Sequence, residues 1–163
     1  MDPSIWIHTF EKVYTMKFSW LLFGLIFLYG CSVTRQTENA FVVISVEKLP
    51  CMGNCPAYKL RIYNNHIAIY EGKENVDKIG VYTTKISKKK FSELQEAFLN
   101  SDFFEMKDVY SARIMDLQTT YIYFKLNEKE KKILDYYDGP KVLKDLVNIV
   151  EELNEQNRWK KVK

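Results

Sequence analysis

Two cysteines separated by three residues are the part of the sequence best suited to chemistry. They lie in LPCMGNCPAY, residues 49–58, with a proline on each outer side. Cys51 and Cys55 could form a redox couple, hold a soft metal ion or close a disulfide. Redox catalysis and metal binding both require the thiolate form, whereas a disulfide requires an oxidising compartment. The choice therefore depends on where the protein lives and on the element that follows the motif.

The segment preceding this motif indicates export. Lys17 is followed by an apolar run of 12 residues, Phe18 to Tyr29. A spanning helix needs about 20 apolar residues, so a run of this length is typical of a secretory signal. An uncleaved anchor helix is the alternative. Residues 1–15 supply no basic block, so we expect translation to start at Met16 rather than at Met1.

The end of the apolar run reads Leu28-Tyr29-Gly30-Cys31. This tetrad resembles the lipobox of bacterial lipoproteins, in which an aliphatic, a variable and a small residue precede a cysteine. The resemblance implies cleavage after Gly30 and a lipid on Cys31, which would anchor the protein to a membrane.

These signals divide the chain into four parts. We expect an N-terminal extension and signal peptide over residues 1–30, and a polar tether over residues 31–39. One α+β domain should occupy residues 40–157, followed by a basic tail over residues 158–163.

Assigning Cys31 to lipid leaves Cys51 and Cys55 as a matched pair in an oxidising place, where disulfides persist. A disulfide that closes so short a loop should raise the free energy of unfolding by roughly 2 kcal/mol, because it restricts the unfolded chain. A reactive pair commonly sits at a helix N-terminus, which lowers the thiol pKa. Here a strand pattern, Ala57 to Tyr63, follows instead. We therefore predict a structural disulfide and no catalytic thiol.

A metal site is the alternative interpretation of the same residues. C-x-x-x-C-P also occurs in copper-handling assembly proteins, where a distant histidine completes the site. His66 is the sole histidine after the signal segment, so Cys51, Cys55 and His66 form the alternative copper or zinc set. A lone histidine leaves no Ser-His-Asp arrangement and no multi-histidine zinc site. The prediction is a non-enzymatic protein without a cofactor.

Hydrophobic patterning predicts the elements that position these residues. Residues 41–46 are β-branched and predict a strand buried on both faces. Tyr58, Leu60 and Ile62 alternate with polar residues, which is typical of a strand covered on one face. The other expected strands are residues 67–70, 79–86, 119–126 and 131–137.

Two helices complete the pattern. Ser87 can cap a helix over residues 88–100, whose apolar positions are Phe91, Leu94, Phe98 and Leu99. Pro140 opens the last helix, whose apolar stripe is Val142, Leu143, Leu146, Val147, Val150 and Leu153. The order ββββ-α-ββ-α predicts an α+β fold, an antiparallel sheet with two helices packed on one face.

Further polar and aromatic residues are weak candidates for binding. Asp116 and Thr119 stand before a strand, and Tyr121 and Tyr123 alternate along it. Such tyrosines can bind a glycan or peptide, although cross-strand packing explains them equally. Lys88, Lys89 and Lys90 open a helix at the end where cations are disfavoured. They predict either contact with anionic headgroups or polymer, or a solvated face.

The assembled motifs resemble a bacterial family, domain of unknown function 6438. The shared pieces are P-C-x-G-x-C-P-x-Y (residues 50–58), Y-E-G (70–72), S-D-F-F (101–104), D-L-x-T-T (116–120) and G-P (139–140). The resemblance covers roughly residues 41–155 and implies an exported, lipid-anchored domain. It implies no activity.

The net charge of +3 is too small for a nucleic-acid partner, which usually meets a concentrated basic stripe. We expect a lipid-anchored protein of the bacterial cell envelope, attached through Cys31, with its domain facing the periplasm or the exterior. Its partner would be an envelope protein or a glycan. The alternative is a thiol-redox or metal-handling protein.

Overall fold

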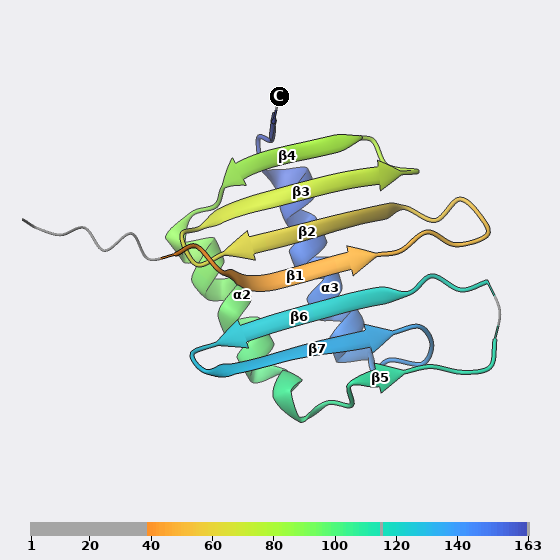
Figure 1. The fold of residues 1–163 in the computed structure, drawn as a ribbon. Helices are drawn as coiled ribbons and strands as arrows, with labels where there is room; N and C mark the ends of the chain where they lie inside the picture. The colour runs from red at the N-terminus through yellow and green to blue at the C-terminus, as the bar shows by residue number, and fades with distance from the viewer. Residues whose placement is uncertain (1–38, 115, 163) are drawn as a thin grey trace, which may run out of the picture. The chain divides into compact units, whose positions relative to one another are not determined.

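The computed structural model describes residues 39–114 and 116–162. The expected signal segment and Cys31 lie outside the described residues. The fold is α+β, as predicted, with two helices and a mostly antiparallel sheet of eight strands in the order β5-β7-β6-β1-β2-β3-β4-β8 (Figure 1). Among the residues described, no helix combines the length and hydropathy that crossing a membrane requires.

The strands are β1 (Val42–Lys48), β2 (Ala57–Tyr63), β3 (Ile67–Glu74), β4 (Gly80–Lys85), β5 (Val109–Tyr110), β6 (Thr120–Leu126), β7 (Lys129–Asp135) and β8 (Lys160–Lys161). The helices are α2 (Lys88–Asn100) and α3 (Lys141–Gln156), with a short 3-10 helix, η2 (Phe103–Glu105).

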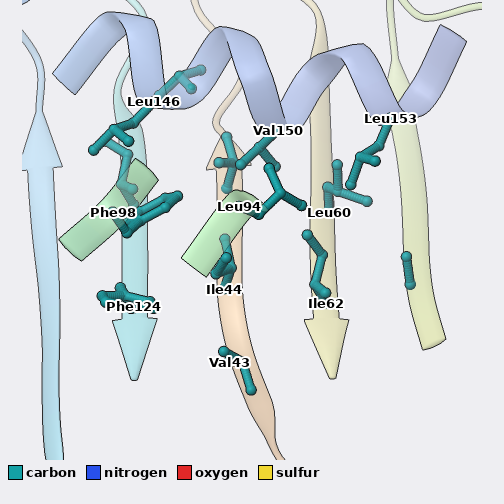
Figure 2. Packing of buried hydrophobic residues seen from close by; sticks show 14 of the residues in the cluster. Val43, Ile44, Leu60, Ile62, Leu94, Phe98, Phe124, Leu146, Val150 and Leu153 are labelled. Atoms are coloured by element: carbon teal, nitrogen blue, oxygen red, sulfur yellow. The ribbon is translucent and has the colours of Figure 1, made fainter. Parts of the chain in front are cut away.

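Both helices cover the same face of the sheet and leave the other face open (Figure 1). The core between the helices and the sheet is apolar, with Leu60, Leu94 and Val150 nearly inaccessible to solvent (Figure 2). Phe98 and Phe124, whose ring centroids are 5.0 Å apart, join α2 to β6. Both helix stripes were predicted too wide. Leu99 of the α2 stripe is 44% exposed and Val142 of the α3 stripe is 39% exposed, while the other residues of both stripes are buried.

The central strand β1 differs from its prediction. The sequence predicted a strand buried on both faces, and the consecutive residues Val43 and Ile44 are indeed both buried. In the structure the register shifts between Val42 and Ile44, so Val43 is the extra residue of a β-bulge. Since a bulge brings two consecutive side chains toward one face, β1 is buried on the helix side only.

Three elements were absent from the predicted order. Residues 101–114, for which no helix or strand was predicted, contain η2 and β5, and β5 pairs with β7 in parallel. The predicted tail contains β8, which pairs with β4, and Trp159 packs against Tyr70 with ring centroids 5.9 Å apart. The sheet is therefore not wholly antiparallel, and its ordered part continues beyond residue 157.

The strands end at two opposite ends of the sheet. The disulfide end holds the β1–β2 loop (residues 49–56), the β3–β4 turn and the loop before β6 (residues 111–119). The entry end holds the start of β1, the turns at residues 64–66 and 127–128, and the β4–α2 junction (residues 85–90).

Candidate functional site

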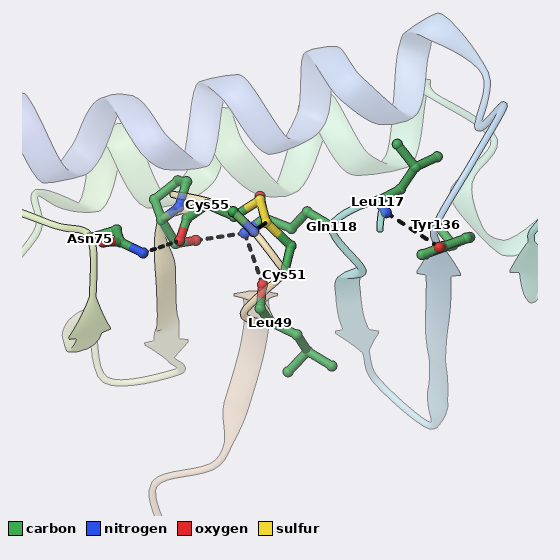
Figure 3. Close-up of a disulfide and its surroundings, with 9 residues drawn as sticks. Leu49, Cys51, Cys55, Asn75, Leu117, Gln118 and Tyr136 are labelled. Carbon is green, nitrogen blue, oxygen red and sulfur yellow. Dashed lines mark hydrogen bonds between the residues drawn. A yellow bond between two sulfur atoms is a disulfide. The ribbon is translucent and has the colours of Figure 1, made fainter. Parts of the chain in front are cut away.

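Cys51 and Cys55 form the predicted disulfide in the β1–β2 loop, with their Cα atoms 5.7 Å apart (Figure 3). The residues between them project outward, and Met52 is 86% exposed. The staple therefore shapes an exposed loop and does not belong to the core.

Side chains from distant segments fix this loop. The Gln118 Nε2 group donates to the carbonyl oxygens of Leu49, at 2.9 Å, and Pro56, at 2.7 Å. Asn75 Nδ2 donates to the carbonyl oxygen of Cys55 at 3.1 Å (Figure 3). Sequence reasoning did not identify Gln118 or Asn75, because no local pattern reveals a partner 62 residues away.

A cavity of about 280 Å³ opens beside the loop, between the sheet and α3. A carboxylate on α3, Glu151, lies at its wall. The Glu151 carboxylate accepts a hydrogen bond from the hydroxyl of Tyr58 and pairs with the Lys48 ammonium at 2.6 Å. The ring of Tyr58 stacks on that of Tyr70, with centroids 5.4 Å apart. These contacts join β1, β2 and β3 to α3.

The electrostatics of this cavity favour recognition over acid–base catalysis. Burial and the neighbouring Glu151 raise the pKa of Tyr58 far above its ordinary value. Burial, together with Asp77 and Glu151, raises the pKa of Tyr70 to about 12. Both hydroxyls therefore keep their protons at neutral pH, and that of Tyr58 donates to Glu151. Glu151 is already engaged by a hydroxyl and an ammonium, so it is poorly placed to accept a substrate proton.

The structure does not bring the alternative metal ligands together. His66 lies in the turn at the entry end, where its ring is 4.7 Å from that of Phe91. The seven residues of β2, about 20 Å of strand, separate it from Cys55. Among residues 39–114 and 116–162, no three His, Cys, Asp or Glu side chains are grouped to hold a metal ion.

Asp116 and Thr119 both lie in the loop before β6, at the disulfide end. Asp116 is exposed and adopts a left-handed conformation, φ 69°, as a turn residue does. The Thr119 carbonyl accepts from the Leu49 N–H at 2.9 Å. Tyr136 holds the same loop in place, because its hydroxyl donates to the Ile114 carbonyl. The same hydroxyl accepts from the Leu117 N–H (Figure 3). Both candidates thus occupy a loop that is held in place from several sides.

Tyr121 and Tyr123 lie instead on the open face of the sheet, opposite Glu47 and Ser45 of β1. The Lys132 ammonium is 4.0 Å from the ring centroid of Tyr121. The Tyr123 hydroxyl donates to Glu130 at 2.8 Å, and burial with this contact raises the pKa of Tyr123 to about 12. The four candidates therefore belong to two separate surfaces, and both tyrosines already have partners within the domain.

Ion pairs continue across the open face. Glu47 lies between Lys59 at 3.0 Å and Lys73 at 3.6 Å, and Arg61 pairs with Glu71 at 3.2 Å. Partial burial raises the pKa of Glu47, but the hydrogen bond and charge of Lys59 and the charges of further lysines outweigh it and lower the pKa overall. Exposed pairs of this kind contribute little stability each.

The entry end is held by backbone contacts. The Phe41 N–H donates to the Asn64 side chain at 3.1 Å, and the Phe41 carbonyl accepts from the Asn64 N–H at 3.0 Å. The Ile86 N–H donates to the His66 carbonyl at 3.0 Å. The start of β1, the β2–β3 turn and the β4–α2 junction are therefore neighbours.

The first turn of α2 carries lysines and no acidic residue. Ser87 caps the helix through its side-chain oxygen, which accepts from the Lys90 N–H at 3.1 Å. Lys89 approaches Glu93 at 3.9 Å and Lys90 approaches Glu152 at 4.0 Å. Cations at a helix N-terminus oppose the macrodipole by about 0.3–1 kcal/mol each, so this lysine cluster is locally unfavourable for the fold.

The family model of a domain of unknown function (DUF6438) matches residues 42–154. The matched range begins at the first residue of β1 and ends in the last turns of α3. No curated protein matches the chain.

Proposed function

We propose that this chain, which belongs to the DUF6438 family, is a lipid-anchored protein of a bacterial cell envelope whose domain binds another envelope component without catalysing a reaction. The observation that carries the proposal is the disulfide between Cys51 and Cys55. Disulfides persist in oxidising compartments outside the cytosol. The bond therefore supports export, which the apolar run before Cys31 also predicts.

Binding explains the polar groups of the domain better than catalysis does. The cavity beside the disulfide loop holds protonated tyrosines and an engaged carboxylate. Such groups can orient a ligand by hydrogen bonds, but none of them is poised as a base or nucleophile.

The disulfide end is the surface that we expect the partner to contact. It presents the cavity, the exposed Met52 and the braced loop that holds Asp116 and Thr119. A loop held by a disulfide and by Gln118 loses little conformational entropy on binding. An envelope protein or a glycan would suit this mixture of apolar and hydrogen-bonding groups.

Replacing Cys31 by alanine tests the anchor. In an expressing bacterium, C31A should move the protein from the membrane fraction to the soluble envelope fraction or leave it as an unprocessed precursor. The matched control is Cys51→Ser combined with Cys55→Ser, which should stay in the membrane fraction. Equal membrane retention of processed C31A and the unaltered chain would refute the lipid anchor.

Thiol titration of the purified full chain addresses the thiol-redox alternative. We expect the thiols of Cys51 and Cys55 to become reactive only after reduction, with no bound copper or zinc. Two reactive thiols in the freshly isolated protein, or a stoichiometric metal, would favour the alternative over the binding function.

A further inference from the structure

We infer that the entry end is a docking surface for the anionic headgroups of the membrane that bears the Cys31 lipid, an inference that rests on the proposed anchoring. The surface consists of the β4–α2 junction, residues 85–90, together with Phe41 and Ile67. Its expected occupant is a lipid bilayer that contains anionic lipids.

The charge of the junction points to an anionic partner. The six residues Lys85-Ile86-Ser87-Lys88-Lys89-Lys90 contain four lysines and no acid. Lys85, Lys88 and Lys89 are exposed, and neither Lys85 nor Lys88 has an ion-pair partner among the described residues. Lys88, Lys89 and Lys90 lie in the first turn of α2, where a positive charge opposes the helix dipole. An external anionic surface would turn this local disadvantage into an attraction.

The place of the junction in the fold points to the membrane as that surface. The Ile86 N–H of the junction donates to the His66 carbonyl in the β2–β3 turn. Asn64, in the same turn, is hydrogen-bonded to both the N–H and the carbonyl of Phe41. The lysines therefore lie at the same end of the sheet as the start of β1 (Figure 1). The lipid would precede β1 in the chain, so it would hold this end toward the bilayer.

Apolar side chains stand among these cations. Phe41, just before β1, is 46% exposed, and Ile67, the first residue of β3, is 36% exposed. The Lys125 ammonium is 5.4 Å from the ring centroid of Phe41. Aromatic and basic side chains together suit the headgroup region, where a ring meets the acyl boundary and an ammonium meets phosphate.

The acids of the entry end do not cancel the junction. Glu128 and Glu130 lie at the β6–β7 turn, where Lys125 and Lys129 balance them in number. Glu130 is also bound by Tyr123 and Lys125. Glu93 and Glu152 approach Lys89 and Lys90, so the excess positive charge of this end comes from Lys85 and Lys88, which have no ion-pair partner among the described residues.

The expected tether permits docking without enforcing it. The eight residues from Ser32 to Asn39 span at most about 28 Å when fully extended. Electrostatic attraction to a membrane falls off within about 8 Å at physiological salt. An anchored domain could thus stay undocked, which makes docking a separate and measurable property.

The experiment uses the full lipidated chain, purified in detergent and reconstituted into vesicles. One set of vesicles contains phosphatidylcholine alone, and the other contains phosphatidylcholine with 30% phosphatidylglycerol. Acetylation rates of individual lysines are measured by mass spectrometry. We expect Lys88 and Lys89 to react at least threefold more slowly on the anionic vesicles. Lys141 and Lys144, which open α3 near the disulfide end, should react at the same rate on both sets.

A variant pair tests the cause of this protection. In Lys88→Gln combined with Lys89→Gln, protection of Lys85, an exposed lysine of the junction that is left unaltered, should fall by at least half. The control, Lys141→Gln combined with Lys144→Gln, should keep it. Raising the salt concentration to 0.5 M should also abolish protection in the unaltered chain.

Equal acetylation of both ends on both vesicles, in a chain that stays vesicle-bound, would overturn the docking surface and leave the proposed anchoring intact. A chain that leaves the phosphatidylcholine vesicles altogether would overturn the anchoring and, with it, the docking that rests on it.

Discussion

The disulfide end and the entry end terminate the same strands, yet they are stabilised differently. At the disulfide end, a covalent bond and the side chains of Gln118 and Asn75 hold long loops. At the entry end, short turns are closed largely by backbone hydrogen bonds, and the adjoining helix begins with unfavourable charge. The first end is therefore held in a fixed shape by side chains and a disulfide, whereas the second presents uncompensated positive charge.

The largest effect should come from overpacking at the disulfide end. A Cβ atom on Gly72 would stand 1.8 Å from the backbone oxygen of Lys78, which cannot move without shifting the β3–β4 turn. Gly72→Ala should lower the free energy of unfolding by about 3 kcal/mol, measured by urea titration of Trp159 fluorescence. Gly53→Ala is the matched control, because its Cβ would meet only Cys51 Sγ, at 3.8 Å. Similar losses in both variants would show that the packing at Gly72 is not the cause.

Removing the staple should have the next largest effect. Cys51→Ser combined with Cys55→Ser should lower the free energy of unfolding by about 2 kcal/mol, because the unfolded chain regains the entropy of an open loop. Reductant should destabilise the unaltered domain by the same amount and leave the double variant unchanged. A domain insensitive to reductant would mean that the loop is held by Gln118 and Asn75 alone.

Alkaline pH should lower the stability that the buried, protonated Tyr58 confers. Its pKa is raised in the folded state, so the unfolded chain releases this proton above pH 10 while the folded domain retains it. Stability should therefore be intact below pH 10 and fall above it, by about 1.4 kcal/mol per pH unit from this tyrosine. Unfolding free energies at pH 10 and 11 should show a shallower fall in Tyr58→Phe. An identical fall in both proteins would contradict the role of the Tyr58–Glu151 contact.

The smallest effect, and the opposite sign, is expected at the entry end. Lys88→Glu places an anion in the first turn of α2 and should raise the free energy of unfolding by about 0.5 kcal/mol. Lys144→Glu makes the same change of charge in the first turn of α3 and should give a gain of similar size. A loss of stability in Lys88→Glu would mean that Lys88 supports the fold, which would erase the contrast between the two ends.

Local signals predicted the elements well where they were strong. Ser87 and the spacing of Phe91, Leu94 and Phe98 predicted α2 with the bounds that it has. The alternation along residues 58–62 and 122–124 predicted which side chains of β2 and β6 face the core. Pro140 was placed one position too far into α3, because it precedes the first helical residue and serves as its N-cap.

Features that depend on distant partners were missed. The bulge at Val43 follows from the register between β1 and β2. The strands β5 and β8 form only because they pair with the edges of the sheet at β7 and β4. In the site, the cysteine count and the predicted compartment were enough for the disulfide. Gln118 gave no signal, because its two acceptors are backbone carbonyls of a loop far away in the sequence.

The two edge strands of the sheet, β5 and β8, affect how copies of the domain associate. Each is only two residues long, and β8 consists of two exposed lysines. A strand with an unpaired edge can pair with a second molecule and start aggregation, and short, charged edge strands resist this. Proteins on a membrane are concentrated in two dimensions, so such edge strands would help crowded copies to remain separate.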